Sequence, residues 1–342
     1  MPVKIAELAP YIGLCLSVLV LSVLATGLIV NLAKKIGLVA TPDGRTLHKG
    51  AKPLGGGGPV IVLALGAWVL WAWPLSPVYI ALLVSAIILG VVSLIDDFLT
   101  VSAALRFSLQ MIAVAICLYF LPSEQHVIWT GWSIVIDRLV TGLCWLWFIN
   151  LYNFMDGIDG LAASETISIC IGVVLIGYFV GLPIDLVLLA ALVACGAAGF
   201  LPWNWHKSRI MLGDLGSIPI GFLLGFLLIN LAMKGYLVAA LLLPLYFVAD
   251  ASITLVRRIL TGERFWQPHN THFYQNATKW GGLGHDQVVI RIIGANIIFI
   301  GAAFLSLSNS MLAVLLAGFT LALLLWHFLN VARRSQLAFK DA

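Results

Sequence analysis

Long runs of apolar residues, separated by short polar segments, dominate the chain from residue 11 to residue 331. A helix that crosses a hydrocarbon layer about 30 Å thick needs roughly 20 mostly apolar residues. The pattern predicts an all-α polytopic membrane protein, a bundle of about 11 transmembrane helices that forms a single domain over residues 1–342. The predicted spans are 11–33, 59–75, 78–95, 104–121, 134–152, 161–180, 184–201, 215–233, 236–256, 288–308 and 310–331.

The composition excludes several other classes of protein. Apolar and aromatic residues make up 61% of the chain and charged residues 10%, against about 25% charged residues in an ordinary soluble domain. A water-soluble globule, a disordered chain and a coiled coil are therefore excluded. All five cysteines lie in apolar runs, where we expect buried packing residues. The net charge of +4 is too small for this length to indicate a nucleic-acid partner.

The positions of the basic residues predict the orientation in the membrane. Sixteen Lys and Arg fall on one side of the predicted spans, and only Lys4, Arg138 and Lys234 fall on the other. Basic residues are concentrated in cytoplasmic loops, so we expect the N-terminus outside and the C-terminus in the cytoplasm. The first apolar run lacks the basic start and the small-residue cleavage site of a signal peptide, which predicts a retained span. The cytoplasmic active-site loops would then be 34–58, 96–103, 153–160, 202–214 and 257–287.

Acidic residues gather at the cytoplasmic ends of the predicted helices. Asp96 and Asp97 are adjacent and repel each other in a partly desolvated site, unless a cation neutralises them. Mg²⁺ binds one or two carboxylates together with phosphate oxygens and water, so a magnesium ion is the simplest way to neutralise this pair. Alternatively the pair lies in water at a helix end, although acids are unfavourable at a helix C-terminus. Taken alone, Asp214 would be an ordinary helix cap.

The segment NLYNFMDGIDG, residues 150–160, has a polar residue at every third position: Asn150, Asn153, Asp156 and Asp159. Residues three apart are neighbours on a helix surface. Glycines after the two aspartates allow a tight turn and a close approach of a ligand to the backbone. Two amides and two carboxylates at a helix end favour binding of a nucleotide and a metal, and the alternative is a capped turn.

Basic residues and histidines follow the ninth predicted span. The segment RRILTGERFWQPHNTHFYQ, residues 257–275, joins Arg257 and Arg258 to His269 and His272. A zinc site would require a further ligand that this segment lacks, so we favour phosphate contacts made by both pairs. A solvated loop is the simpler alternative. Asp250 shares a predicted helix face with Arg257, which suggests either a functional acid or a partner for that arginine.

The first cytoplasmic loop, DGRTLHKGAKPLGGGG, combines four consecutive glycines with cations. It does not match a Walker A loop, because no GK[ST] follows. Lys49 and Lys52 could neutralise a diphosphate. The alternative is a basic loop that only obeys the positive-inside rule.

Acids for Mg²⁺ and bases for phosphate on one membrane face favour phosphoryl transfer, which depends mainly on positioning and charge neutralisation. A site at the interface suits one water-soluble nucleotide and one lipid. The competing hypothesis is a membrane transporter or flippase for anionic lipid or sugar substrates. Transporters usually place their binding groups near the bilayer midplane in repeated halves, and neither feature is evident here.

The blocks LIDDF, NLYNFMDGIDGLAA, GFLPWN…MLGDLGS and HNTHFYQ occur in this order. In this combination the chain resembles the polyprenyl-phosphate N-acetylhexosamine-1-phosphate transferase family. The resemblance implies transfer of a sugar 1-phosphate from a UDP-N-acetyl sugar to undecaprenyl phosphate, with release of UMP. It also implies Mg²⁺ or Mn²⁺ as cofactor and a homodimer. The enzyme would lie in the bacterial cytoplasmic (inner) membrane with its site facing the cytoplasm. Its product would initiate O-antigen or other cell-envelope polysaccharides.

The resemblance also assigns roles to single residues. It implies that Asp214 is a direct metal ligand and that Asn204 lies near the uracil. It places Asp96 and Asp97 near the lipid phosphate and the metal. It places Asn153, Asp156 and Asp159 at the nucleotide and the metal. His269 and His272 match the histidines that the family carries in its last loop.

Three departures from the family pattern refine this expectation. In the family a lysine often follows the acidic pair by a few residues, whereas here Thr100 occupies that region and Arg106 is the first cation. The muramoyl-pentapeptide branch has three consecutive histidines in the last loop, and HNTHFYQ does not, which argues against the peptidoglycan precursor as product. Met211 replaces an aromatic residue common three positions before the metal-binding aspartate. The form of the last loop is similar to the O-antigen-initiating branch, which includes enzymes for N-acetylated 6-deoxyhexoses. We expect Asp96 to activate or position the lipid phosphate, or else to serve the metal together with Asp97.

Overall fold

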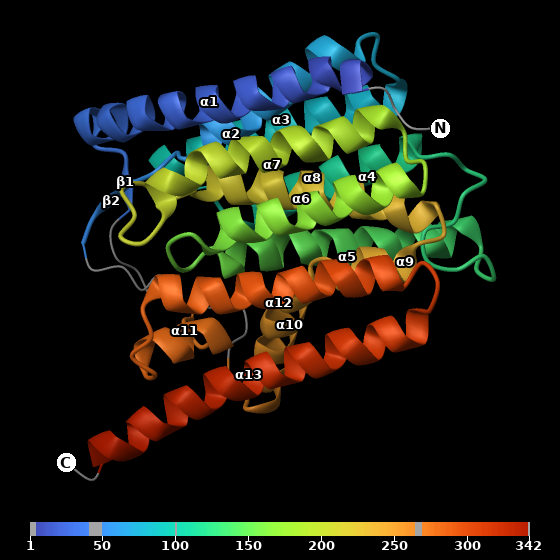
Figure 1. The fold of residues 1–342 in the computed structure, drawn as a ribbon. Coiled ribbons are helices and arrows are strands. Elements are labelled where there is room, and N and C mark those ends of the chain that lie inside the picture. The colour runs from blue at the N-terminus through green and yellow to red at the C-terminus, as the bar shows by residue number, and fades with distance from the viewer. Residues whose placement is uncertain (1–4, 41–49, 100, 264–268, 341–342) are drawn as a thin grey trace.

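Helices form over the apolar runs in the computed structural model, which describes residues 5–40, 50–99, 101–263 and 269–340. Two short strands, β1 (Val39–Ala40) and β2 (Lys52–Pro53), pair in antiparallel fashion. The all-α polytopic architecture predicted from the sequence is confirmed (Figure 1). The helices are α1 (Ile5–Ile36), α2 (Gly57–Ala72), α3 (Pro77–Phe98), α4 (Ala103–Phe120), α5 (Ile134–Met155), α6 (Leu161–Phe179), α7 (Ile184–Asn204), α8 (Asp214–Met233), α9 (Leu237–Leu242), α10 (Leu245–Leu260), α11 (Phe273–Lys279), α12 (His285–Leu305) and α13 (Ser310–Lys340).

The helices differ in number from the eleven predicted spans. Among the described residues, nine helices are long and apolar enough to cross a membrane. The predicted span at 59–75 forms α2, an apolar helix of 16 residues. The predicted span at 236–256 is divided into α9 and α10, with Pro244 directly before α10. Proline has no backbone N–H and its ring crowds the preceding helical turn, which favours a break at this point, although Pro10, Pro202 and Pro219 lie within continuous helices.

Helix α8 forms the centre of the bundle. In its most apolar stretch of 18 residues, 89% of the residues are buried, against 17% in the corresponding stretches of the outer helices α1 and α13. Two of its glycines explain the close packing. A Cβ on Gly216 would lie 2.7 Å from the Cα of Gly57 in α2, and a Cβ on Gly225 would lie 2.3 Å from the indole of Trp145 in α5. Small residues let helix backbones approach closely, so the neighbouring helices fix the start of α8.

The glycine segment after β2 is joined to the segment before α8 by backbone hydrogen bonds. The N–H of Met211 donates to the carbonyl of Pro53 at 2.8 Å, and the N–H of Gly56 donates to the carbonyl of Met211 at 3.0 Å. A Cβ on Gly56 would lie 2.3 Å from the ring of Phe200, so this glycine is required by packing. The pairing holds β2, and therefore Lys52, beside the loop that leads into α8.

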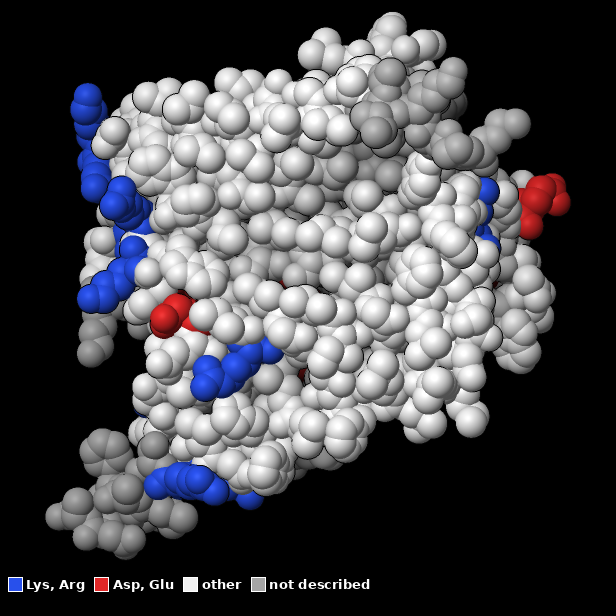
Figure 2. All heavy atoms as spheres, in the orientation of Figure 1, with Lys and Arg blue, Asp and Glu red and all other residues white. Residues whose placement is uncertain are grey.

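Basic side chains gather at one end of the bundle. Figure 2 shows Lys and Arg concentrated at the end that carries β1 and β2 in Figure 1, with few on the visible face at the opposite end. The start of α8 lies at this same end, because the segment before it pairs with β2. Hydrogen bonds and ion pairs bring the ends of α3 and α5 to the start of α8. The polar chemistry of the chain therefore converges at one end of the helices.

Candidate active site

The predicted acidic residues form one cluster where α3 and α5 end and α8 begins. Arg106, near the start of α4, forms ion pairs through Nη1 with Asp96 and with Asp214, the latter at 2.9 Å. Asn153 donates from Nδ2 to Asp214 Oδ1 at 2.8 Å and to Ser217 Oγ at 2.8 Å. The carboxylate of Asp214 is therefore held from two sides.

Asp97 and Asp156 complete this carboxylate cluster. Asp97 Oδ2 is buried and has no hydrogen-bond partner among the described residues. It lies beside Gly213, whose added Cβ would be 3.7 Å away. Burial, together with the negative charges of Asp214 and Asp159, raises the pKa of Asp156 to about 7. A hydrogen bond from the Gly213 backbone N–H acts in the opposite direction and lowers this pKa, but its effect is smaller. An unpaired buried carboxylate oxygen beside further carboxylates fits a hard divalent cation such as Mg²⁺.

Arg106 is a site residue that the sequence analysis did not select. Its side chain lies between two carboxylates that come from different helices, α3 and α8. The only signal in the sequence was its position as the first cation after the acidic pair. Asp96 also accepts a hydrogen bond from the backbone N–H of Val101 at 2.8 Å, so it is a well-paired anion.

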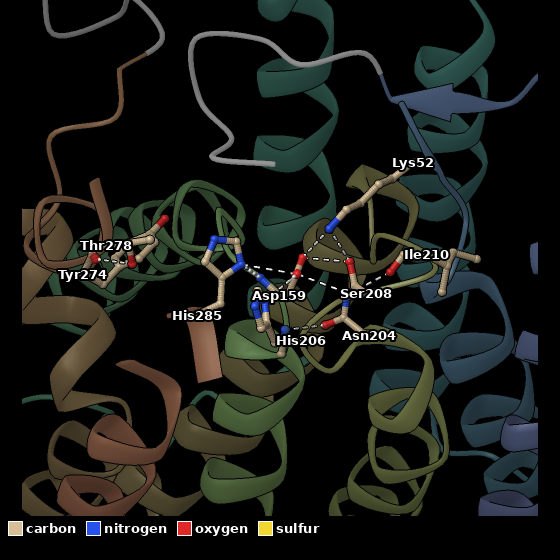
Figure 3. Close-up of polar contacts among 10 residues, drawn as sticks. Lys52, Asp159, Asn204, His206, Ser208, Ile210, Tyr274, Thr278 and His285 are labelled. Atoms are coloured by element: carbon tan, nitrogen blue, oxygen red, sulfur yellow. Dashed lines mark hydrogen bonds and ion pairs between the residues drawn. The ribbon is translucent and has the colours of Figure 1, made fainter. Parts of the chain in front are cut away.

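A second group of polar side chains surrounds Asp159, three residues after Asp156 (Figure 3). Lys52 Nζ and Ser208 Oγ each lie 2.7 Å from Asp159 Oδ1. His206 Nδ1 and His285 Nδ1 each lie 3.3 Å from Asp159 Oδ2. Burial alone would raise the pKa of Asp159, but hydrogen bonds from His285, Lys52 and Ser208 lower it well below its ordinary value. An anion with this many donors is a poor proton acceptor.

Asn204 connects two loops of the site. Its Oδ1 accepts from the Gly160 backbone N–H at 2.9 Å, and its Nδ2 donates to the Ile210 carbonyl at 2.9 Å (Figure 3). The residue is buried. Both polar groups of the side chain are used to hold the loop 156–160 against the loop before α8, so Asn204 acts here as a positioning residue.

The last-loop histidines are anchored by Asp250 in α10. His272 Nδ1 lies 3.1 Å from Asp250 Oδ1, and the His269 ring stacks on His272 at 4.9 Å between centroids. Burial, followed by repulsion from His272 and Arg258, lowers the pKa of His269 to about 4. Asp250 therefore holds His272, whereas Arg257, the arginine on the same predicted helix face, donates to the Thr271 carbonyl.

This loop also contacts the segment after α5. Tyr274 donates through its hydroxyl to the Phe154 carbonyl at 3.4 Å. A Cβ on Gly157 would lie 2.2 Å from that hydroxyl oxygen, so Gly157 is required for close approach of the two segments. The histidine loop and the DGIDG segment thus form adjacent walls of one site.

The remaining predicted residues that the structure describes lie at the border of the site. Arg257 donates to the Thr271 carbonyl at 2.9 Å, and Arg258 Nε pairs with Glu263 at 2.8 Å. The Arg257 contact joins α10 to the histidine loop, whereas the Arg258 contact stays at the end of α10. Asn150 donates to Gln110 in α4 and to its own helix, one turn away from the carboxylate cluster. Lys49 lies outside the described residues.

His206, Ser208 and His285 were also not selected from the sequence. Each lies in, or directly after, a loop predicted to be cytoplasmic, which is the only signal that pointed to them. The contact with Asp159 joins the loops after α7 and before α12 to the end of α5. Sequence separation hides contacts of this kind, because they depend on how the helices pack.

Replacing Asp250 with asparagine should loosen α11. The fully buried carboxylate accepts from Tyr246 and Thr254 and from the backbone N–H groups of Phe273 and Tyr274. An amide NH₂ facing these donors leaves some of them unpaired, at about 1–3 kcal/mol. Amide hydrogen exchange in 273–279 should accelerate about tenfold or more, since 1.4 kcal/mol is a factor of ten. Unchanged exchange there, or the same change in Asp185→Asn, would contradict this role.

Comparison with known proteins places these features in context. Residues 79–232 match the model of glycosyl transferase family 4. A probable undecaprenyl-phosphate N-acetylglucosaminyl 1-phosphate transferase of Bacillus subtilis is 26% identical over 80% of this chain and 78% of its own length. A phospho-N-acetylmuramoyl-pentapeptide-transferase of Moorella thermoacetica is 28% identical over 72% and 83%. A decaprenyl-phosphate N-acetylglucosaminephosphotransferase of Mycobacterium tuberculosis is 27% identical over 84% and 80%.

Proposed function

Since the chain belongs to the polyprenyl-phosphate N-acetylhexosamine-1-phosphate transferases of glycosyl transferase family 4, we propose that it transfers the sugar 1-phosphate of a UDP-N-acetyl sugar to undecaprenyl phosphate. The donor is a UDP-N-acetylhexosamine or its N-acetylated 6-deoxy form. The product initiates O-antigen or another cell-envelope polysaccharide. The enzyme works in the bacterial cytoplasmic (inner) membrane with its site facing the cytoplasm, as a homodimer.

The observation that supports this proposal most is the meeting of acids and cations at one end of the bundle. The carboxylate cluster provides hard oxygen ligands, including the unpaired Asp97 Oδ2. Arg106 and Lys52 provide positive charge at either side of it. Phosphoryl transfer between two anionic substrates requires this combination of metal ligands and cations.

In the proposed reaction, an oxygen of the lipid phosphate attacks the β-phosphorus of the UDP-sugar. A new P–O bond forms, the bond from the β-phosphorus to the bridging oxygen breaks, and its electron pair leaves with UMP. Asp97, Asp156 and Asp214 would hold Mg²⁺ or Mn²⁺, which would neutralise the charge of the diphosphate when bound. Asn153 orients Asp214 through its 2.8 Å hydrogen bond.

A general base is not needed for this step. The second pKa of a phosphate monoester is about 6, so the attacking oxygen is largely ionised near neutral pH. Asp96 is already paired with Arg106 and with the Val101 N–H. We therefore assign Asp96 to holding Arg106 toward the incoming lipid phosphate. Lys52, fixed by Asp159, neutralises the charge on the nucleotide side. His272, anchored by Asp250, lies in the adjacent wall of the site.

The test is UMP release by purified protein in detergent with undecaprenyl phosphate and a panel of UDP-N-acetyl sugars. We expect UMP with one donor, only when the lipid is present. Treatment with EDTA should reduce the rate at least about a hundredfold, because the site loses its main source of electrostatic stabilisation. Excess Mg²⁺ or Mn²⁺ should restore it.

The same preparation separates the proposal from the transporter alternative. The protein reconstituted in vesicles is supplied with labelled UDP-sugar and lipid. Movement of either compound across the bilayer without UMP formation would favour a transporter or flippase. UMP formation that persists in EDTA would contradict the metal-dependent mechanism.

A further inference from the structure

Two histidines face the same oxygen of Asp159. His206 follows α7, and His285 is the first residue of α12. The Nδ1 atom of each histidine lies 3.3 Å from Asp159 Oδ2. Each of the three residues offers one possible metal-ligand atom, and these three atoms lie within 4.8 Å of one another. The rings are 5.0 Å apart between centroids. Figure 3 shows both rings directed toward the carboxylate.

The hydrogen-bond contacts around the two rings are long. The backbone N–H of Asp159 lies 3.3 Å from His285 Nδ1, and His206 Nδ1 lies 3.3 Å from Asp159 Oδ2. His285 Nδ1 also lies 3.3 Å from Asp159 Oδ2. Charge-assisted hydrogen bonds are shorter, at about 2.7–2.9 Å. A cation between the two atoms would attract both.

The spacing fits a tetrahedral metal. Zinc binds histidine nitrogen and carboxylate oxygen at about 2.0–2.2 Å, and two such ligands at a tetrahedral angle are about 3.3–3.5 Å apart. The two contacts to Asp159 Oδ2 have this length. We propose that Asp159, His206 and His285 form a binding site for Zn²⁺ or a similar borderline transition metal, in addition to the function proposed above.

The surroundings of Asp159 support a metal at this position. Its other oxygen, Oδ1, is held by Lys52 and Ser208 at 2.7 Å each, which fixes the carboxylate as outer-sphere partners do in metal sites. The Ser208 backbone N–H donates to Oδ2 at 3.2 Å and uses one lone pair, which leaves the other for the metal. The His206 side chain is 30% exposed, so an ion can enter and water can occupy the fourth position.

The chemistry of the ligands separates this site from the carboxylate cluster. Asp97, Asp156 and Asp214 offer only oxygen, which suits Mg²⁺ or Mn²⁺. The Asp159 site offers two imidazoles and one carboxylate, a set that suits Zn²⁺, Co²⁺ or Ni²⁺. Millimolar Mg²⁺ should therefore fail to displace the transition metal, although Asp156 and Asp159 are only three residues apart.

The experiment is a Co²⁺ titration of metal-free protein purified with a tag that contains no histidine. The buffer contains Mg²⁺ but no nucleotide or lipid, so the result does not depend on transferase activity. We expect one equivalent of Co²⁺ with the intense visible absorption of tetrahedral coordination, displaced by Zn²⁺. The variants His206→Asn and His285→Gln should each lower the affinity about tenfold or more.

His126→Gln is the matched control, because His126 lies between α4 and α5, outside the site. Its Co²⁺ affinity should equal that of the unaltered protein. Equal affinity in all three variants would overturn the proposal. X-ray absorption on the zinc-loaded unaltered protein gives an answer even if a variant misfolds. Two imidazoles and oxygen in the first shell support the site, whereas sulfur or oxygen alone overturns it.

Discussion

Asp214→Asn should abolish UMP release, with a rate at least about a hundredfold to a thousandfold lower than that of the unaltered protein. Asp214 is the first residue of the central helix α8, and it is held by Arg106 at 2.9 Å and by Asn153 at 2.8 Å. Asparagine keeps the shape of the side chain but removes the charge that would bind a divalent cation. The measurement is initial UMP release at saturating lipid, UDP-sugar and Mg²⁺.

Two comparisons show whether the loss concerns the metal. Glu124→Gln removes an exposed acid in the segment between α4 and α5 and should leave the rate unchanged. The thermal midpoint of Asp214→Asn without metal should fall only slightly. Asn153 and Arg106 donate to different oxygens of Asp214, so the amide oxygen can still accept from one of them, and the other can turn to water because the side chain is 25% exposed. A rate for Asp214→Asn within twofold of the unaltered protein would remove Asp214 from the metal site.

Gly57→Ala should lower both stability and activity. A Cβ at this position would lie 2.0 Å from the Cα of Gly216 and 2.6 Å from its nitrogen. Backbone atoms of a central helix cannot move aside as a flexible side chain can, so α2 must shift away from α8. Overpacking of this kind costs about 1–3 kcal/mol and occasionally more. Because Gly216 is two residues from Asp214, the shift should also disturb the carboxylate cluster.

Gly66→Ala in the same helix is the control. Gly66 is exposed, and an added Cβ there meets nothing within 4 Å. Thermal unfolding in detergent and UMP release are measured for both variants. We expect a clear fall in midpoint and rate for Gly57→Ala and no loss for Gly66→Ala, since alanine favours helix more than glycine does. Equal midpoints for the two variants would show that α2 and α8 are not in close contact.

Much of the fold could be predicted because apolar length and charge are local properties of the chain. Runs of about 20 apolar residues identified nine long helices and the shorter α2. The prediction was wrong at residues 236–256, where hydropathy continues through Pro244 but the helix does not. Hydropathy averages over a window and does not register the missing N–H of one proline.

The candidate site was predicted in part. The sequence selected the acids of the carboxylate cluster by their positions at predicted helix ends, and the structure brings Asp96, Asp97 and Asp214 together. It could not show that Asp96 and Asp214 share Arg106. Nor could it show that both polar groups of the Asn204 side chain form hydrogen bonds with backbone groups of Gly160 and Ile210.

By itself, the sequence determined that the chain is a bundle of membrane-spanning helices with its polar chemistry gathered at one end. Burial of apolar runs requires this, and the order of the acidic and histidine blocks pointed to the transferase family. Tertiary structure alone decided which of these groups meet. His206 and His285 reach Asp159 from segments 47 and 126 residues away along the chain. Such contacts follow from the packing of whole helices around α8, because a helix moves all its side chains together and no local pattern records where its neighbours lie.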